Sequence, residues 1–399
     1  MAAALNETPT ANRLHIGVFG KRNSGKSSLI NAFTSQKVSI VSDVAGTTTD
    51  PVYKPMEIYP LGPCVMIDTA GFDDEGELGH IRVEKTRLAA EKSDIAVIVC
   101  ADMELKEELE WYRYFKNKST PVLMVINKSD ILMNTKVIEK YIEENTKQVP
   151  IIISAKKGSG VKKVREELVR LLPETYGDRL ITGKLVKEGD IVLLVMPQDI
   201  QAPKGRLILP QVQTLRELLD KKCIVLSTTT DKYIVALECL KRQPKLIVTD
   251  SQAFSYVYEN KPKESMLTSF SVLFAAYKGD LPYYVEGAKA LDKLTVNSKV
   301  LIAECCTHAP LKEDIGREKI PQMLKERVGN LLVDIVSGTD YPEDLSEYDL
   351  IIQCGACMFN RKYVMSRIHR AKEQKIPMTN YGVAIAHLSG ILPQITFPN

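Results

Sequence analysis

The sequence has no apolar run long enough to cross a membrane. Its longest apolar stretches, such as residues 191–196, fall far short of the roughly 20 residues that a membrane helix needs. It also has no long runs of lysine or arginine, and its net charge is only +3, so we expect no nucleic-acid partner. Residues 1–8 have neither the basic start nor the apolar core of a signal peptide, so we expect a cytoplasmic protein that does not bind membranes.

The chain has the length and composition of a soluble protein with several domains. Its 399 residues, 44% of them hydrophobic, are enough for two or three domains with full cores. We expect a disordered tail (1–13), a first domain (14–175), a middle domain (176–262) and a C-terminal domain (263–399). Pro173 and the polar residues after it mark the first boundary.

Short apolar runs alternate with amphipathic helical patterns in all three segments, which predicts an α/β fold with mostly parallel sheets. The predicted strands are residues 15–20, 65–68, 94–100, 122–127, 150–154, 190–196, 223–226, 245–249, 299–305, 331–336, 348–353 and 376–380. The predicted helices are residues 81–91, 104–116, 161–172, 215–222, 232–241, 282–294, 317–328 and 360–375.

Residues 20–27, Gly-Lys-Arg-Asn-Ser-Gly-Lys-Ser, fit the phosphate-binding pattern G-x-x-x-x-G-K-[ST] between a predicted strand and a helical pattern. Gly20 and Gly25 let the backbone curl so that its N–H groups face a phosphate, and the start of the helix adds its positive dipole. Lys26 is expected to reach the β- and γ-phosphates, and Ser27 to hold Mg²⁺. Ser24 and Ser28 complete the expected nucleotide contacts. The sequence therefore predicts that the chain binds a nucleoside triphosphate.

Four further motifs follow in the order of a GTP site. Residues 46–50 contain a threonine, Thr48, that can complete the shell of Mg²⁺. Asp68 ends a predicted strand and can hold Mg²⁺ through water, and the N–H of Gly71 can meet the γ-phosphate. The end of the site that binds the guanine base is predicted to consist of Asn127, Lys128, Asp130, Ser154, Ala155 and Lys156. A carboxylate at Asp130 accepts two hydrogen bonds that guanine offers and adenine does not.

Together these motifs resemble the Era/TrmE group of translation-factor-class GTPases over residues 14–172. The resemblance implies that Thr48 is the switch-I threonine and Asp68 the switch-II aspartate. Phe72 stands where Ras-like proteins keep the glutamine that orients the attacking water. Some members carry an asparagine at the place of Asn23, where it helps to bind an activating K⁺ ion. The resemblance thus implies catalytic roles for Asn23, Lys26 and Thr48, although Asn23 could instead cap its own loop.

A second concentration of reactive residues lies near the C-terminus. Cys306 and His308 follow one predicted strand, and Cys354 and Cys357 follow another, so both pairs can meet at the carboxyl edge of a parallel sheet. Three thiolates at this spacing suit an iron–sulfur cluster or zinc.

Other interpretations of the cysteines stay open at this point. Cys354 and Cys357 at C-x-x-C spacing also resemble a redox pair, and a structural zinc site with three cysteines and one histidine is possible. Cys305 is expected to point to the face opposite Cys306. Four cysteines in apolar stretches are expected to be simply buried: Cys64, Cys100, Cys223 and Cys239.

The C-x-H and C-x-x-C motifs downstream of an Era-like domain resemble the HydF family, GTPases that help to assemble the active-site cluster of FeFe-hydrogenase. The resemblance covers the whole chain, with 45 residues between His308 and Cys354. It implies a 4Fe–4S cluster on Cys306, Cys354 and Cys357, with His308 nearby, and a homodimer through the middle domain. It also implies a scaffold that works with two radical-SAM maturases and delivers a diiron unit to apo FeFe-hydrogenase. An RNA-modification or ribosome-assembly GTPase and a GTP-regulated dithiol protein are the alternatives.

Overall fold

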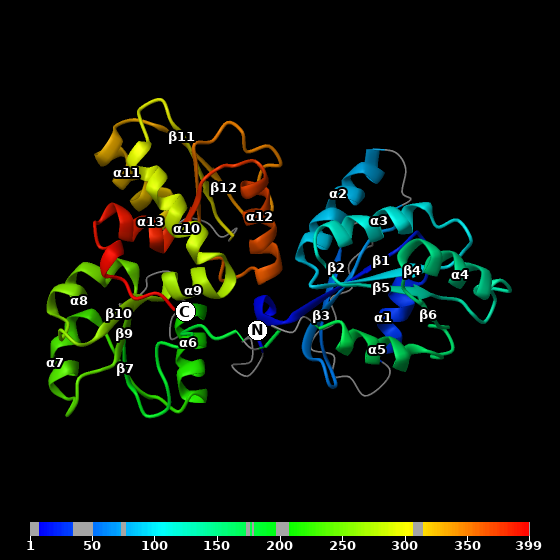
Figure 1. Cartoon of the computed structure of the whole chain (residues 1–399), viewed down its shortest axis with the longest axis horizontal. Coiled ribbons are helices and arrows are strands. Elements are labelled where there is room, and N and C mark those ends of the chain that lie inside the picture. Colours follow the sequence, from blue (N-terminus) through cyan, green and yellow to red (C-terminus); the bar gives the residue numbers. More distant parts are fainter. Residues whose placement is uncertain are drawn as a thin grey trace. The chain divides into compact units, whose positions relative to one another are not determined.

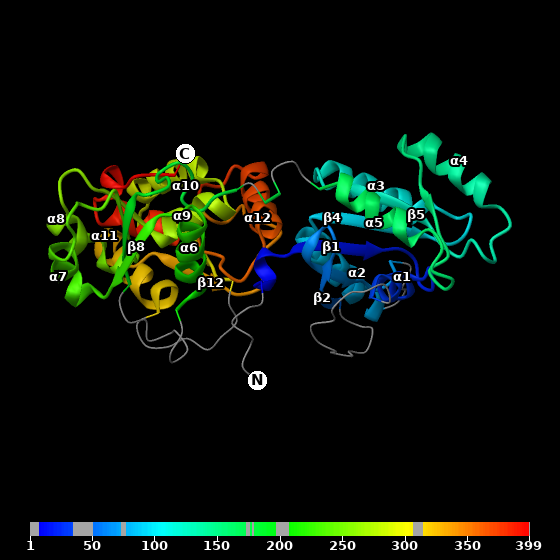
Figure 2. The same ribbon diagram turned by 90° about the horizontal axis from the view of Figure 1, so that it is seen from below.

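The computed structural model of the chain describes residues 8–34, 51–72, 77–172, 176–177, 179–196, 207–305 and 314–398. The chain forms two compact units, which divide after Tyr176. Both units are α/β, with mostly parallel sheets and surrounding helices, as the sequence predicts (Figures 1 and 2). None of the helices in the described stretches combines the length and the apolar character that crossing a bilayer requires.

The first unit contains a six-stranded sheet in the order β2-β3-β1-β4-β5-β6. Only β2 is antiparallel to its neighbour. The strands are β1 (Leu14–Phe19), β2 (Val52–Ile58), β3 (Gly62–Asp68), β4 (Ile95–Cys100), β5 (Val122–Ile126) and β6 (Ile151–Ile152). Every residue of β1, β4 and β5 is buried, because helices cover both faces of the sheet.

In the described part of the first unit, five α-helices cover this sheet. They are α1 (Lys26–Thr34), α2 (Glu77–Lys92), α3 (Lys106–Asn117), α4 (Thr135–Thr146) and α5 (Val161–Arg170). Figure 1 shows α2 and α3 on one side and α1 and α5 on the other. Phe33 and Leu168 belong to the core on the α1 and α5 side, and Phe115 and Ile142 belong to the opposite core. Complete burial of each such side chain contributes about 1.5–3 kcal/mol to stability.

The second unit begins with a four-stranded parallel sheet in the order β10-β9-β7-β8. Its strands are β7 (Ile191–Val195), β8 (Ile224–Thr228), β9 (Leu246–Thr249) and β10 (Met266–Ser269), and its helices are α6 (Leu209–Asp220), α7 (Tyr233–Glu238) and α8 (Phe254–Asn260). Because β10 belongs to this sheet, the sheet extends past residue 262, where the sequence analysis places the end of the middle domain.

A second parallel sheet follows in the order β12-β11-β13-β14. Its strands are β11 (Lys299–Ala303), β12 (Leu332–Val336), β13 (Leu350–Gln353) and β14 (Met378–Asn380). The accompanying helices are α10 (Leu281–Ala288), α11 (Ile320–Val328), α12 (Arg361–Glu373) and α13 (Tyr381–Leu388).

One helix, α9 (Phe270–Lys278), contributes to the cores of both sheets of this unit. Ser269 caps it, because its Oγ accepts a hydrogen bond from the N–H of Val272 at 3.2 Å. Phe270 and Phe274 pack into the core beneath β7 and β9, whereas Val272 and Ala275 belong to the core that includes β11 and β13. In Figure 1 α9 lies between the strands of the β10-β9-β7-β8 sheet and α12.

The burial of the four isolated cysteines corrects one expectation. Cys64, Cys100 and Cys223 are buried as expected, but Cys239 is exposed, so the prediction for Cys239 was wrong. The reason is local: α7 ends at Glu238, and Cys239 is the residue that follows its last turn.

Candidate functional site

The loop between β1 and α1 has a backbone that only glycine accommodates at two positions. Gly20 has a φ of +148°, and a Cβ there would lie 2.4 Å from the carbonyl oxygen of Val99. Gly25 has a φ of +94°, and a Cβ there would lie 2.2 Å from Nδ2 of Asn127. Asn23 also has a left-handed conformation, with a φ of 59°. The loop therefore curls as a phosphate-binding loop requires.

Lys26 is held inside this curl. Its side chain is almost completely buried, and its Nζ donates hydrogen bonds to the carbonyl oxygens of Gly20 and Lys21, each at 2.9 Å. The amine thus lies at the concave side of the loop, where the β- and γ-phosphates of a nucleotide would accept its hydrogen bonds.

The base end of the site is organised around Asn127 and Asp130. Asn127 joins two loops, because its Nδ2 donates to the carbonyl oxygen of Ser24 at 2.9 Å and its Oδ1 accepts from the N–H of Ala155 at 3.0 Å. The Oγ of Ser154 donates to Oδ1 of Asp130 at 2.7 Å, and this hydrogen bond lowers the pKa of Asp130. Asp130 is therefore an ionised acceptor at neutral pH, as recognition of guanine needs.

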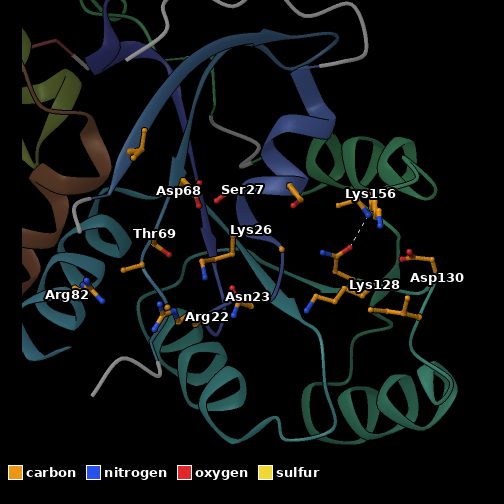
Figure 3. A pocket seen from close by; sticks show the side chains of 18 residues that line it. Arg22, Asn23, Lys26, Ser27, Asp68, Thr69, Arg82, Lys128, Asp130 and Lys156 are labelled. Atoms are coloured by element: carbon orange, nitrogen blue, oxygen red, sulfur yellow. Dashed lines mark hydrogen bonds between the residues drawn. The ribbon is translucent and has the colours of Figure 1, made fainter. Parts of the chain in front are cut away.

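A cavity of about 620 Å³ connects these groups (Figure 3). Of the residues predicted from the sequence, those that line it are Asn23, Gly25, Lys26, Ser27, Ser28, Asp68, Gly71, Asn127, Lys128, Asp130, Ala155 and Lys156. Gly20, Ser24 and Ser154 do not line it but hold the residues that do. Thr48 lies outside the described residues.

Sequence reasoning did not single out Arg22 and Arg82, which also line the cavity. In Figure 3 both lie near Thr69, at the end of the cavity away from Asp130 and Lys128. Arg22 is exposed, and Arg82 comes from α2. Arg22 could have been identified from the sequence, because it lies inside the phosphate loop. Nothing in the sequence distinguishes Arg82 from the many other charged residues of α2.

Lys21 ties the phosphate loop to the segment that leads into α3. Its Nζ lies 3.5 Å from Asp102, 3.2 Å from Glu107 and 3.9 Å from Glu108, and it also donates to the carbonyl oxygen of Glu104. Glu108 is only 1% exposed, and burial raises its pKa to about 7. This cluster, in which Lys21 and Glu108 are buried, fixes the first turn of the loop against α3.

Phe72, which follows Gly71, is the residue expected to stand in place of a water-orienting glutamine. Its side chain is 9% exposed and lies in the core that contains Leu109 and Phe115. An apolar ring packed in this way cannot orient a water molecule, so that task would fall to other groups.

The two strands that precede the cysteine motifs end at the same edge of the last sheet. β11 and β13 are parallel neighbours, with Ala303 opposite Gln353, so Cys305 and Cys354 follow adjacent strand ends. The N–H of Cys305 donates to Sγ of Cys354 at 3.1 Å, and a hydrogen bond from the Cys305 side chain lowers the pKa of Cys354. Cys305 was not expected to lie against Cys354.

Two of the predicted metal ligands cannot be placed. Cys306 and His308 lie outside the described residues, whereas Cys354 and Cys357 are described and half-buried. Within the stretches that the structure describes, no group of three or more His, Cys, Asp or Glu side chains is arranged to hold a metal. Iron–sulfur binding at these cysteines therefore stays a prediction.

Three family models match the chain. Residues 15–128 match the 50S ribosome-binding GTPase, residues 181–279 the hydrogen maturase F dimerization domain, and residues 282–397 the hydrogen maturase F tetramerization domain. The last two matches leave out only residues 280 and 281 between them, where the chain passes from α9 into α10.

Relatives of the first unit are GTPases. The chain is 34% identical to GTPase Der of Wolinella succinogenes over 46% of the chain and 40% of the relative. It is 32% identical to the tRNA modification GTPase MnmE of Heliobacterium modesticaldum over 40% of the chain and 34% of the relative. The chain thus spans well under half of these two curated relatives. A solved structure of Era with MgGDPNP and 16S ribosomal RNA covers 55% of the chain and 93% of that protein, at 21% identity and a TM-score of 0.35.

Proposed function

The chain belongs to the hydrogen maturase F family, and on that premise we propose that it is a GTP-hydrolysing scaffold in the maturation of FeFe-hydrogenase. In this proposal the first unit binds and hydrolyses GTP. The last sheet carries a 4Fe–4S cluster at its carboxyl edge and passes a diiron unit to the apo-hydrogenase. The observation that supports it most is the joint presence of a cavity lined by most of the expected GTP-binding residues and of cysteines that follow adjacent strands of a parallel sheet.

In the nucleotide site each group has a defined task. Asp130 accepts the two hydrogen bonds of guanine, and Asn127 holds the phosphate loop to the loop that contains Ala155. Lys26 and the loop N–H groups neutralise the phosphates, and Ser27 and Asp68 would hold Mg²⁺ together with Thr48. We propose that a K⁺ ion near Asn23 supplies the charge that an arginine finger gives in other GTPases, and that hydrolysis is slow without it.

The described cysteines fit a cluster in their donor chemistry. Cys354 and Cys357 would hold a 4Fe–4S cluster together with Cys306, with His308 nearby. A thiolate at Cys354 receives the N–H of Cys305, and hydrogen bonds of this kind tune cluster sulfurs. When bound, the cluster supplies one iron that can take an exchangeable ligand. Cys305 would support Cys354 rather than bind iron.

Self-association is part of the proposal, because the matched family regions are those of dimerization and tetramerization. We propose a homodimer through residues 181–279, and cytoplasmic action with two radical-SAM maturases and the apo-hydrogenase as partners.

Anaerobic purification of the full chain tests the proposal. We expect a brown protein that contains iron and sulfide, hydrolyses GTP and activates apo-hydrogenase once it is loaded by the maturases. A colourless protein with zinc in place of iron would contradict the cluster. Retained RNA together with loss of activation would favour the Era-like alternative.

A further inference from the structure

A lysine is buried directly beneath the loop that carries Cys354 and Cys357. Lys278, the last residue of α9, is 2% exposed. Its Nζ donates to the carbonyl oxygens of Ala356 at 3.2 Å, Cys357 at 3.1 Å and Phe359 at 2.8 Å. Burial lowers the pKa of Lys278 to about 8.

A buried arginine of α12 also packs against this loop. Arg367 of α12 is 1% exposed, and its guanidinium lies over the rings of Tyr341, Phe359 and Tyr363 at 4.7–5.0 Å. It donates to the carbonyl oxygen of Gly338, but its Nε and Nη1 have no hydrogen-bond partner. Phe359 thus contacts both cations, Lys278 through its carbonyl oxygen and Arg367 through its ring.

Neither buried cation has a carboxylate partner within the described part of the chain. Burial of a charge is costly unless an opposite charge or a full set of hydrogen bonds offsets it. Carbonyl dipoles and ring faces offset part of this cost, yet two donors of Arg367 stay unused. The thiols of Cys354 and Cys357 lie on the loop that both cations contact, and thiols are groups that can become anionic.

We propose that Lys278 and Arg367 are built-in counter-charges for an anionic, thiolate-held iron–sulfur cluster at this loop, and that they set its reduction potential. The inference rests on the proposed function. A cubane core with two positive charges held by three thiolates is a net anion, and reduction adds another negative charge. Fixed cations nearby therefore favour the reduced cluster, since net charge is one of the factors that set cluster potentials. Both side chains are positioning residues, because neither is a ligand.

The test compares variants of the full chain, reconstituted anaerobically with iron and sulfide. Lys278→Met and Arg367→Gln each remove a charge, and Lys278→Arg keeps one. The matched control is Lys372→Met, also from α12, whose amine pairs with Asp280 at 2.6 Å. Iron and sulfide content, the absorption spectrum and a reductive titration followed by electron paramagnetic resonance are measured for each protein.

We expect Lys278→Met and Arg367→Gln each to make reduction about tenfold less favourable, which for one electron is about 59 mV more negative. Lys278→Arg and Lys372→Met should stay near the wild-type potential.

An unchanged potential in a Lys278→Met protein with full iron would overturn the inference and leave the proposed function intact. If Lys278→Met does not fold, Arg367→Gln decides by the same criterion. A potential that shifts equally in Lys278→Arg and Lys278→Met also overturns it. Wild-type protein without iron would instead refute the cluster itself.

Discussion

The ring of Phe72 stacks on the indole of Trp111, with centroids 5.6 Å apart and planes 17° apart. The same indole stacks on Phe19, the last residue of β1, at 5.7 Å and 18°. Phe72 directly follows Gly71, whose N–H is expected to meet the γ-phosphate. Since Trp111 is the single tryptophan of the chain, the stack connects the γ-phosphate site to a unique fluorescent group.

We predict that tryptophan emission differs between the GDP-bound protein and the protein bound to a non-hydrolysable GTP analogue. Movement of Gly71 toward a γ-phosphate would displace Phe72 and change the surroundings of Trp111. In Phe72→Leu the difference in emission between the two nucleotide states should largely vanish while the nucleotide still binds. Trp111→Phe, which lacks the indole, should show no tryptophan emission. Identical spectra in both nucleotide states of the wild type would show that the stack does not follow the γ-phosphate.

The base-reading role of Asp130 predicts a change of nucleotide preference. Asp130→Asn should weaken GTP binding about tenfold to a hundredfold, because loss of hydrogen bonds to a charged group costs about 1.5–3 kcal/mol. The same variant should gain affinity for xanthosine triphosphate, whose base offers an acceptor in place of the amine. Ser154→Ala, which removes the hydrogen bond to Asp130, serves as control and should weaken binding without changing the preference. Unaltered GTP affinity in Asp130→Asn would argue against the assigned base site.

The proposed cation at Asn23 predicts faster hydrolysis in potassium than in sodium. We expect removal of the side chain to lower the rate in potassium by about a hundredfold, the typical effect of losing one group that stabilises charge in the transition state. Asn23→Gly is a better test than Asn23→Ala, because glycine tolerates the backbone φ of 59° at this position. Turnover is measured in each salt at equal ionic strength. A potassium response that survives in Asn23→Gly would place the ion elsewhere.

Burial of Glu108 predicts a pH dependence of stability. Its pKa rises from 4.5 to about 7 on folding, so the folded state keeps a proton that the unfolded chain loses. Wild-type stability should therefore fall as the pH rises from about 4.5 to 7, by up to about 3 kcal/mol from this group. Glu108→Gln should lack this loss, so its stability relative to wild type should increase toward pH 8. Urea unfolding of the nucleotide-free chain from pH 5 to pH 8 measures this, with the exposed Glu110→Gln as control. Parallel profiles for wild type and Glu108→Gln would contradict the assignment.

Serine variants of the cysteines should separate ligands from neighbours. Cys354→Ser and Cys357→Ser should lose most of the iron, because an oxygen ligand poorly replaces a thiolate. Cys305→Ser should retain it, since the backbone N–H that meets Cys354 is unchanged, and the exposed Cys239→Ser is the control. GTP hydrolysis should persist in all four proteins. A Cys354→Ser protein with full iron that still activates hydrogenase would be incompatible with the proposed ligands.

Most residues that line the cavity of the first unit could be predicted from the sequence, because the motifs that contain them are local. The phosphate loop, Asp68 and Asn127 lie at strand ends, and buried strands such as β4 are continuous apolar runs. The antiparallel β2 was missed because it contains Lys54 and Pro55 and shows no clear alternation. Helix α4 was also missed, since its apolar residues are few.

The surroundings of the cysteine loop could not be predicted, because they depend on tertiary burial. Helix α9 is apolar around most of its circumference, so it shows no helical period, and Lys278 at its end has the sequence context of a surface residue. Arg367 lies among other basic residues of α12, and only packing against Tyr341 and Phe359 distinguishes it. The sequence alone does not show whether a charged side chain is buried.

The position of α9 limits how far the second unit can be divided into interchangeable parts. By sequence α9 belongs to the region that ends at residue 279, yet its last side chain binds three carbonyl groups of the cysteine loop. A fragment that starts at residue 282 would leave those carbonyl groups without their donor and would expose the apolar surface that α9 covers. Grafting the cysteine-bearing region onto another scaffold therefore requires carrying α9 along with it.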